Sequence, residues 1–310
     1  MSFRSKQCAR VEYLLKNGNI FYGDHGGGTF RGKAYPFVLK VAENNLYAPL
    51  KKDIQHYFKE NEIAWWSGDL TNHTLSSQVA CLNHLFPLRE DKSAVLSIVK
   101  RICPEIADLS IIETDRFKPA YIQFEASSKS DHLNEGVATR GSYCTSADAL
   151  ICGVKEDGKK ILFLIEWKYT EAYDDVNKAA GNEGETLIGR YAAFIRKSAQ
   201  LKSVNTAAYY FEPFYQLMRQ TLFAEQMVIN KSAEAIHADS YMHIHVIPSG
   251  NGELMHKTYP CSGKQMEDTW RSLIKDQKKY KIVSPKDLLK PISGIQRYQA
   301  LTDYLMTRYW

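Results

Sequence analysis

Five consecutive apolar residues, Ile161–Ile165, stand directly before the tripeptide Glu-Trp-Lys at 166–168. Such a run is typical of a β-strand that is buried on both faces of a sheet. A second apolar segment at 145–154 precedes it, and the polar residues 156–159 lie between the two. The pattern predicts an antiparallel β-hairpin. Because an acid and an amine at a buried strand end are costly unless paired or metal-bound, this hairpin indicates a chemical site.

The alternation of side chains along the two strands determines which polar groups can meet. Glu166 and Lys168 point to one face of the predicted strand, and Trp167 points to the other. A two-residue turn would place Asp148 opposite Trp167, so that it would face away from the other two polar groups. We therefore predict a loop of odd length or a bulge. A three-residue loop at 157–159 places Asp148 opposite Lys168 and diagonal to the glutamate.

Two carboxylates and a lysine at one strand end suit a divalent cation and an activated water. Mg²⁺ prefers oxygen ligands and commonly uses one or two carboxylates together with waters and phosphate oxygens. Asp148 and Glu166 are the predicted carboxylate ligands, the backbone carbonyl of Trp167 is a third, and Mn²⁺ is expected to substitute for Mg²⁺. Lys168 is expected to position or help deprotonate the attacking water and to stabilise charge on a phosphate.

These residues resemble the signature of the PD-(D/E)XK nuclease superfamily, which includes many restriction enzymes and DNA-repair nucleases. The matching positions are Asp148 on one strand and residues 166–168 on the next. The resemblance is closest to a bacterial group that carries phrases similar to residues 76–88 and 165–171. It extends over about residues 45–245 of the chain.

The resemblance implies an α/β protein with a restriction-endonuclease-like core, in which helices flank a four-stranded mixed sheet, and a helical N-terminal extension. The expected division is an extension at 1–105, a core at 106–265 and a basic C-terminal helical segment at 266–310. The implied activity is Mg²⁺-dependent hydrolysis of DNA phosphodiester bonds. Double-stranded DNA is the expected partner, a homodimer is a possible assembly, and restriction or other anti-phage defence is the implied setting.

Two features depart from the superfamily pattern. Ala147 stands where the superfamily name has proline, a change that is common among divergent members. The superfamily also uses an acid from the first core helix, for which the chain offers Glu125 or Glu135, and we prefer Glu125 as the fourth catalytic residue. Gln78 and Gln216 are expected to face the site as polar neighbours.

The net charge of +5 is concentrated in one stretch near the C-terminus. Between Arg271 and Lys290 there are seven basic residues and two acidic ones, so the rest of the chain is balanced. Such a stretch, with Tyr280 inside it, is expected to contact the DNA backbone without recognising sequence. The alternative is a solvated helix face or loop.

Targeting and redox signals are weak in this sequence. No segment has the roughly 18 consecutive apolar residues that span a bilayer, and no signal peptide is visible, so we expect a cytoplasmic protein without membrane contact. The six cysteines are scattered, with no two closer than eight residues. Their spacing argues against a zinc ribbon and against a disulfide framework.

Other functional classes remain as alternatives. The leading one is a catalytically inactive nucleic-acid-binding module that keeps the nuclease fold. A weaker one is a nucleotide hydrolase that uses His243 and His245 on a predicted strand, although Tyr241 stands where such an enzyme needs a third histidine. The pair Trp65 and Trp66 could stack on bases, but core packing is the more frequent role of such residues.

Overall fold

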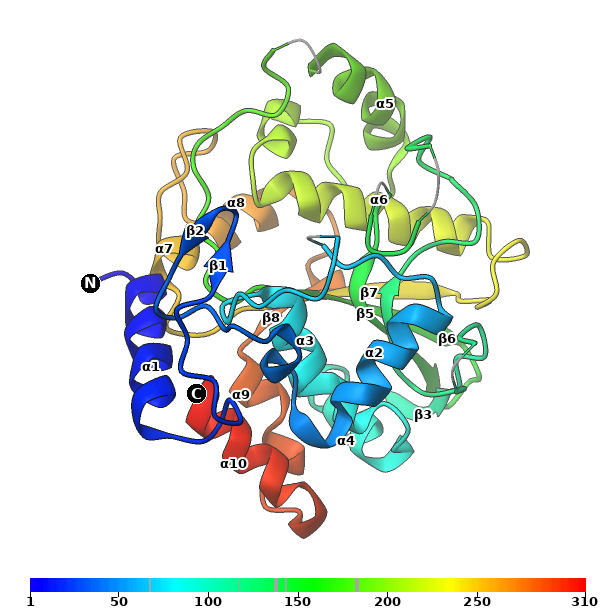
Figure 1. Ribbon diagram of the computed structural model, residues 1–310. Helices are drawn as coiled ribbons and strands as arrows, with labels where there is room; N and C mark the ends of the chain where they lie inside the picture. Colours follow the sequence, from blue (N-terminus) through cyan, green and yellow to red (C-terminus); the bar gives the residue numbers. More distant parts are fainter. Residues whose placement is uncertain (67, 117, 137–138, 143, 182–183) are drawn as a thin grey trace.

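The computed structural model describes residues 1–66, 68–116, 118–136, 139–142, 144–181 and 184–310. Within these ranges six strands form one mixed sheet, with helices on both of its faces (Figure 1). The strands, in spatial order, are β3 (Ile106–Ser110), β5 (Ala147–Lys155), β6 (Lys160–Trp167), β7 (Ser240–Val246) and β8 (Tyr280–Val283), and β4 (Gln123–Ala126) also pairs with β5. The mixed α/β prediction is confirmed, whereas the predicted number of four strands is wrong.

The hairpin of β5 and β6 forms the centre of this sheet. The two strands are antiparallel to each other. On its other edge β6 pairs in parallel with β7, and β7 in turn pairs in parallel with β8. Ile151 and Phe163 belong to one hydrophobic cluster, and Cys152 and Leu164 belong to another on the opposite face. The uninterrupted apolar run of β6 is therefore explained by burial on both sides.

Helices from distant parts of the chain cover the two faces. The first face carries α2 (Lys51–Glu60), α3 (Ser77–Leu85), α4 (Lys92–Ile102), α9 (Pro285–Leu288) and α10 (Gln299–Arg308). The second face carries α5 (Gly184–Lys197), α6 (Phe214–Ile229), α7 (Gly252–Met255) and α8 (Met266–Leu273). Short 3-10 helices occupy Ala42–Asn45, Ala48–Leu50, Phe86–Leu88, Thr206–Tyr210, Gln277–Lys279, Lys290–Ile292 and Gln296–Tyr298.

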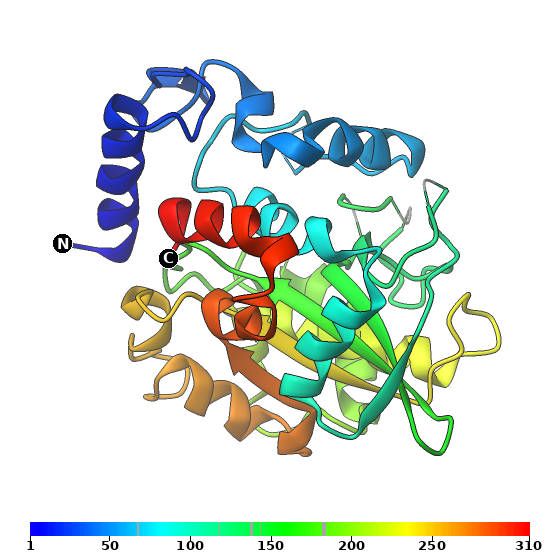
Figure 2. The ribbon, with the colours of Figure 1, turned by 90° about the horizontal axis from the view of Figure 1, so that it is seen from below.

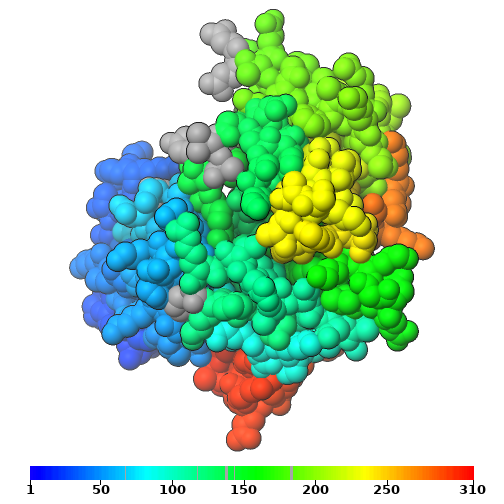
Figure 3. All heavy atoms as spheres, turned by 90° about the vertical axis from the view of Figure 1, so that its right-hand side faces the viewer, coloured from blue at the N-terminus to red at the C-terminus, as the bar shows by residue number. Residues whose placement is uncertain are grey.

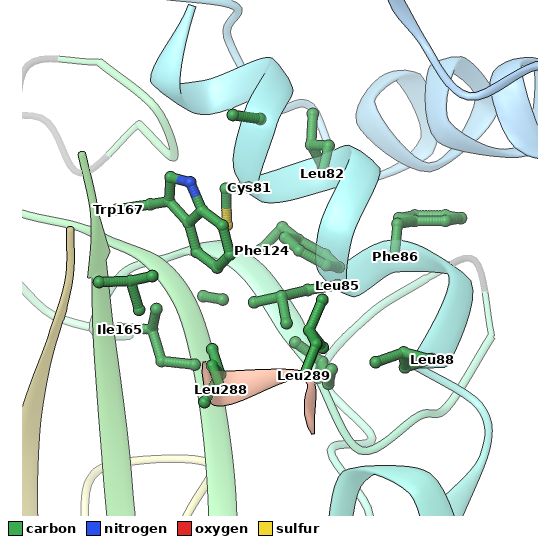
Figure 4. Packing of buried hydrophobic residues seen from close by; sticks show 14 of the residues in the cluster. Cys81, Leu82, Leu85, Phe86, Leu88, Phe124, Ile165, Trp167, Leu288 and Leu289 are labelled. Atoms are coloured by element: carbon green, nitrogen blue, oxygen red, sulfur yellow. The ribbon is translucent and has the colours of Figure 1, made fainter. Parts of the chain in front are cut away.

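Helix α3 packs directly on the end of the central hairpin. Figure 4 shows Ile165 and Trp167 pointing from β6 toward this helix, where Cys81 and Leu85 lie. Trp167 is 1% exposed, so its ring is a full part of the core. This packing holds the N-terminal end of α3 beside the end of β6, which is where the polar tripeptide begins.

The two terminal segments are more varied than the predicted helical ones. The N-terminal segment begins with α1 (Phe3–Asn17) and then forms a small hairpin of β1 (Thr29–Phe30) and β2 (Lys33–Ala34). Arg10 of α1 donates to the carbonyl oxygens of Met306 and Thr307, so the two ends of the chain lie together (Figure 2). The predicted C-terminal helical segment contributes β8 to the sheet. The first hydrophobic cluster includes residues from all three predicted segments, whose boundaries stay a prediction.

The loop between β5 and β6 decides the register of the hairpin. Val154 pairs with Lys160, and the amide of Lys155 donates to the carbonyl of Lys159 at 2.9 Å, which leaves a three-residue loop at 156–158. The predicted odd length is confirmed, but the loop starts one residue earlier than predicted. As a result Asp148 lies opposite Glu166 and not opposite the lysine.

The helices of the described ranges do not have the length and composition of a membrane span. No helix there combines the length and the apolar composition that crossing a bilayer requires.

The loop register gives a first test. Gly158 has a φ of +81°, a conformation that costs a residue with a Cβ about 1 kcal/mol or more. We expect Gly158→Ala to lower the free energy of unfolding by about that amount in urea titrations. As a matched control, Gly189→Ala lies inside α5 with open space around its Cβ and should raise stability by about 0.5–1 kcal/mol. Equal effects of the two substitutions would contradict the assigned loop.

Candidate active site

Three carboxylates lie abreast on three adjacent strands. The register of β5 with β6 sets Asp148 opposite Glu166. On the other side of β5, Phe124 pairs with Ala149 and Ala126 pairs with Ala147. Glu125 therefore lies opposite Asp148. We call these three residues the acid row. All three line one open cleft of about 900 Å³, so the hairpin and β4 bring together acids that are separated by more than 40 positions in the sequence.

Glu125 reaches this row through an unusual backbone. Its φ is +47°, in the left-handed region that residues other than glycine rarely adopt, and such conformations cluster at functional sites. Its carboxylate accepts a hydrogen bond from the Nε2 of Gln78 at 2.7 Å and one from the hydroxyl of Ser146 at 3.4 Å. Gln78 lies on α3, so the predicted polar neighbour is confirmed as a contact of the site.

Neither candidate for the first-helix acid lies on a helix. Glu125 belongs to β4, and Glu135 lies in the loop before β5. Glu135 accepts hydrogen bonds from Thr145 and Tyr191 and pairs with Arg219 at 3.0 Å. Although burial acts to raise it, Arg219 and these hydrogen bonds lower the pKa of Glu135. The residue therefore ties the loop to α5 and α6, and of the two candidates it is Glu125 that joins the acid row.

Glu166 at the end of β6 and Lys168 just beyond it are held by α6. Lys168 donates to Glu166 at 2.5 Å and also contacts the side-chain oxygen of Gln216, the second predicted polar neighbour. Gln220, one turn further along α6, donates to the other oxygen of Glu166. The sequence analysis missed Gln220, although its spacing of four residues from Gln216 is the signal that could have found it.

The acid row carries more negative charge than its surroundings neutralise. Burial and the repulsion of Glu166 and Glu125 raise the pKa of Asp148 well above its usual value. Burial and the repulsion of Glu166 also raise the pKa of Glu125 to about 7, although the hydrogen bond from Gln78 opposes the shift. A site whose carboxylates raise one another's pKa favours the binding of a cation.

Lys168 supplies one positive charge to this site. Burial acts to lower its pKa, but attraction to Glu166 and the other nearby acids outweighs burial and raises the pKa above the usual value. The amine therefore stays protonated at neutral pH. Of the three predicted roles, charge stabilisation and positioning of water fit a protonated lysine, whereas removal of a proton from water does not.

The donor atoms fit Mg²⁺ in kind. Asp148 and Glu166 present carboxylate oxygens, and the carbonyl of Trp167 lies between Glu166 and Lys168 in the chain. Within the described ranges, however, no three His, Cys, Asp or Glu side chains converge as a ready ligand set. Such a site suits a cation whose coordination is completed by water and phosphate oxygens, as is common for Mg²⁺.

Four arginines from distant parts of the chain line the same cleft. Arg4 and Arg31 come from the N-terminal segment, and Arg190 and Arg219 come from α5 and α6. Figure 3 shows these two regions as separate parts of the surface, with the middle of the chain between them. The sequence analysis missed these arginines because they are isolated in the sequence.

The basic stretch occupies a different place. Within the described ranges, none of residues 271–290 lines the cleft. Several of its cations have local partners instead: Arg271 pairs with Glu267 at 2.7 Å, and Lys275 donates to the carbonyl of Ser198 at 2.7 Å. Phosphate contact by this stretch stays a prediction, and it concerns a surface outside the cleft.

The two histidines of β7 are buried in the protein. His243 is 2% exposed and His245 is fully buried, where its Nδ1 contacts the hydroxyl of Tyr280 at 2.9 Å. Burial lowers the pKa of His243 to about 4. A free nucleotide has no access to these rings, so the hypothesis of a nucleotide hydrolase that uses them is wrong.

One comparison with known proteins gives a match. A family model described as Restriction Endonuclease associating with ARP matches residues 7–310. No curated protein and no solved structure matches the chain.

The raised pKa of Glu125 gives a second test. The pKa of Glu125 is about 7 in the folded protein, whereas an unperturbed glutamate has a pKa of 4.5. Ionisation of Glu125 therefore lowers the free energy of unfolding as the pH rises from about 4.5 to about 7. We expect Glu125→Gln to raise the free energy of unfolding at pH 8, by up to about 3 kcal/mol, and to change it little at pH 4. Urea titrations at the two pH values check this. The exposed Glu113→Gln serves as the control and should be neutral at both.

A decrease in stability of Glu125→Gln at pH 8 would contradict the charge excess that we assign to the acid row.

Proposed function

Because the chain belongs to the family of restriction endonucleases associating with ARP, we propose that it is a metal-dependent nuclease that hydrolyses DNA phosphodiester bonds. The observation that carries this proposal is the acid row beside protonated Lys168, in a cleft whose walls carry four arginines. The finer assignment to the PD-(D/E)XK superfamily is part of the proposal, and the pairing of Asp148 with Glu166 supports it.

In this proposal each residue of the site has a distinct task. Asp148, Glu166 and the carbonyl of Trp167 hold Mg²⁺, with Mn²⁺ as a substitute. When bound, the ion lowers the pKa of a water and offsets charge on the phosphate. Lys168, fixed by Glu166 and Gln216, donates to the phosphate and stabilises the charge that develops there. Glu125, with a pKa near 7, accepts the proton of the attacking water.

The arginines account for the affinity for DNA in this proposal. Arg4, Arg31 and Arg190, which all line the cleft, contact phosphates of the bound DNA. Such contacts depend on salt and carry no sequence information. Double-stranded DNA as the substrate, a homodimer as the active assembly and a role in restriction or anti-phage defence are further parts of the proposal.

One observation favours a second candidate, a catalytically inactive module that binds nucleic acid and keeps the fold. Glu166 is already neutralised by Lys168 and bonded to Gln220, and the described side chains include no ready set of three metal ligands. A protein of this kind would bind DNA through the arginines but would not cleave it.

Substitutions at the site separate the two candidates. We expect Asp148→Ala and Lys168→Ala to reduce DNA cleavage by about 100-fold or more, because one removes a metal ligand and the other a charge on the phosphate. Cleavage of plasmid and linear DNA is followed on gels with Mg²⁺ or Mn²⁺, and DNA binding is measured in EDTA. The exposed Glu113→Ala and Lys100→Ala are matched controls that should cleave like the wild type. Unchanged cleavage in both site variants would refute the assignment, and binding without cleavage by the wild type would favour the inactive module.

Metal binding can be tested without any substrate. A ligand at about 100 times its Kd stabilises the folded state by about 2.7 kcal/mol, so saturating Mn²⁺ should raise the thermal midpoint of the wild type. Asp148→Ala should lose this increase, while Glu113→Ala should keep it. Metal binding requires an ionised Asp148, and burial together with the repulsion of Glu166 and Glu125 raises the pKa of Asp148 well above its usual value, so the increase should be larger at pH 8 than at pH 6. Equal increases in the wild type and in Asp148→Ala would place the metal elsewhere.

A further inference from the structure

An exposed tryptophan stands at the mouth of the cleft. Trp66 is 71% exposed, yet it belongs to the lining of the cleft that holds the acid row. Its neighbour Trp65 has the opposite environment, because it stacks on Phe58 with 3.8 Å between ring centroids. Trp65 is therefore partly buried against the core, whereas Trp66 presents its ring to solvent. A large exposed aromatic ring beside a polar site is typical of a binding contact.

Arg31 and Phe30 extend this exposed ring into a platform. The guanidinium of Arg31 lies 5.3 Å from the centroid of Trp66 and 5.4 Å from that of Phe30. Arg31 has a φ of +49° and Gly32 one of +77°, and the two residues form the tight turn between β1 and β2, whose hairpin is labelled in Figure 1. An exposed aromatic ring in contact with a planar cation matches a nucleobase and its adjoining phosphate.

One side chain connects this platform with the acid row. The backbone amide of Trp66 donates to the Oε1 of Gln78 at 3.4 Å. The Nε2 of the same Gln78 donates to Glu125 at 2.7 Å. The side chain of Gln78 therefore separates a base that stacks on Trp66 from the carboxylate of Glu125. In this position the phosphate of the stacked base lies within the cleft.

The charge of the cleft selects the chemistry of the occupant. Arg4, Arg31 and Arg190 line the cleft together with the exposed ring of Trp66, in addition to the acid row and two further acids, Glu135 and Glu171. A polyanion with flat aromatic groups, which is a nucleic-acid strand, complements both features. A base inside a continuous duplex is stacked on its own neighbours, so it offers no free face to Trp66. A base in an unpaired segment does.

On the basis of the proposed nuclease function, we propose that Trp66 and Arg31 form a base-stacking subsite that holds an unpaired base of the DNA substrate next to Glu125. The substrate class is then DNA with an unpaired segment beside the bond that is cleaved, such as a bubble or a single-stranded overhang. A protein partner that covers the ring is the competing occupant, and it predicts no effect of Trp66 on DNA binding.

The test measures binding in EDTA, so that it does not depend on cleavage. Fluorescence anisotropy compares a labelled duplex with the same duplex carrying a central unpaired bubble. We expect Trp66→Ala to weaken binding of the bubble DNA by about tenfold, to change binding of the plain duplex by less than about twofold, and Trp66→Phe to restore most of the loss. Tyr13→Ala, which removes a ring that is 65% exposed on α1 and outside the cleft lining, is the matched control and should bind both like the wild type.

The outcomes separate this inference from the proposed function. If Trp66→Ala binds both DNAs like the wild type, or weakens both equally, the stacking subsite is wrong, and cleavage by the wild type still upholds the nuclease. If Trp66→Ala loses the bubble DNA selectively while the wild type cleaves nothing with Mg²⁺ or Mn²⁺, the subsite stands and the nuclease function fails. Absence of DNA binding by the wild type overturns both.

Discussion

The register of the β5–β6 hairpin is the constraint on which the rest of the site depends. Because side chains alternate between the two faces of a strand, a shift of the β5–β6 pairing by one residue would turn Asp148 away from Glu166. The three-residue loop that ends at Gly158 prevents this shift, since its length is odd and its last residue adopts a positive φ. Burial on both faces does not select the register by itself, because the run of β6 is apolar on both sides and a shifted strand would bury it as well. A chemical site is thus positioned by a loop at the far end of the hairpin.

The site that this register creates is costly for the fold. Three carboxylates share a buried strand end with one amine, and burial together with mutual repulsion raises the pKa of Asp148 and of Glu125. Two glutamines of α6 hold Lys168 and Glu166 in place, and Gln78 of α3 holds Glu125 from the opposite side. Proteins retain unfavourable arrangements of this kind where function needs them. The arrangement is therefore better explained by chemistry than by stability.

Around the acid row, the cleft gathers segments that are far apart in the chain. The tip of the β1–β2 hairpin contributes Arg31, while α5 and α6 contribute Arg190 and Arg219. Packing of the N-terminal segment against α10 and of α3 against Trp167 holds one wall, and the hydrogen bonds of Glu135 hold the other. The N-terminal segment is thus part of the site and not an appendage to the sheet.

The sequence alone determined the features that depend on local pattern: the hairpin, the placement of Glu166 and Lys168 on one face, and the odd loop that brings Asp148 to them. These follow from the period of a strand and from the cost of burying charge. Only the tertiary structure decided that Glu125 joins the row from a strand, that six strands form the sheet, and that His243 is buried. It also brought isolated arginines into the cleft, while phosphate contact by the basic stretch stays a prediction that concerns another surface. The physical reason is that contacts between distant segments depend on packing, which leaves no periodic signal in the sequence.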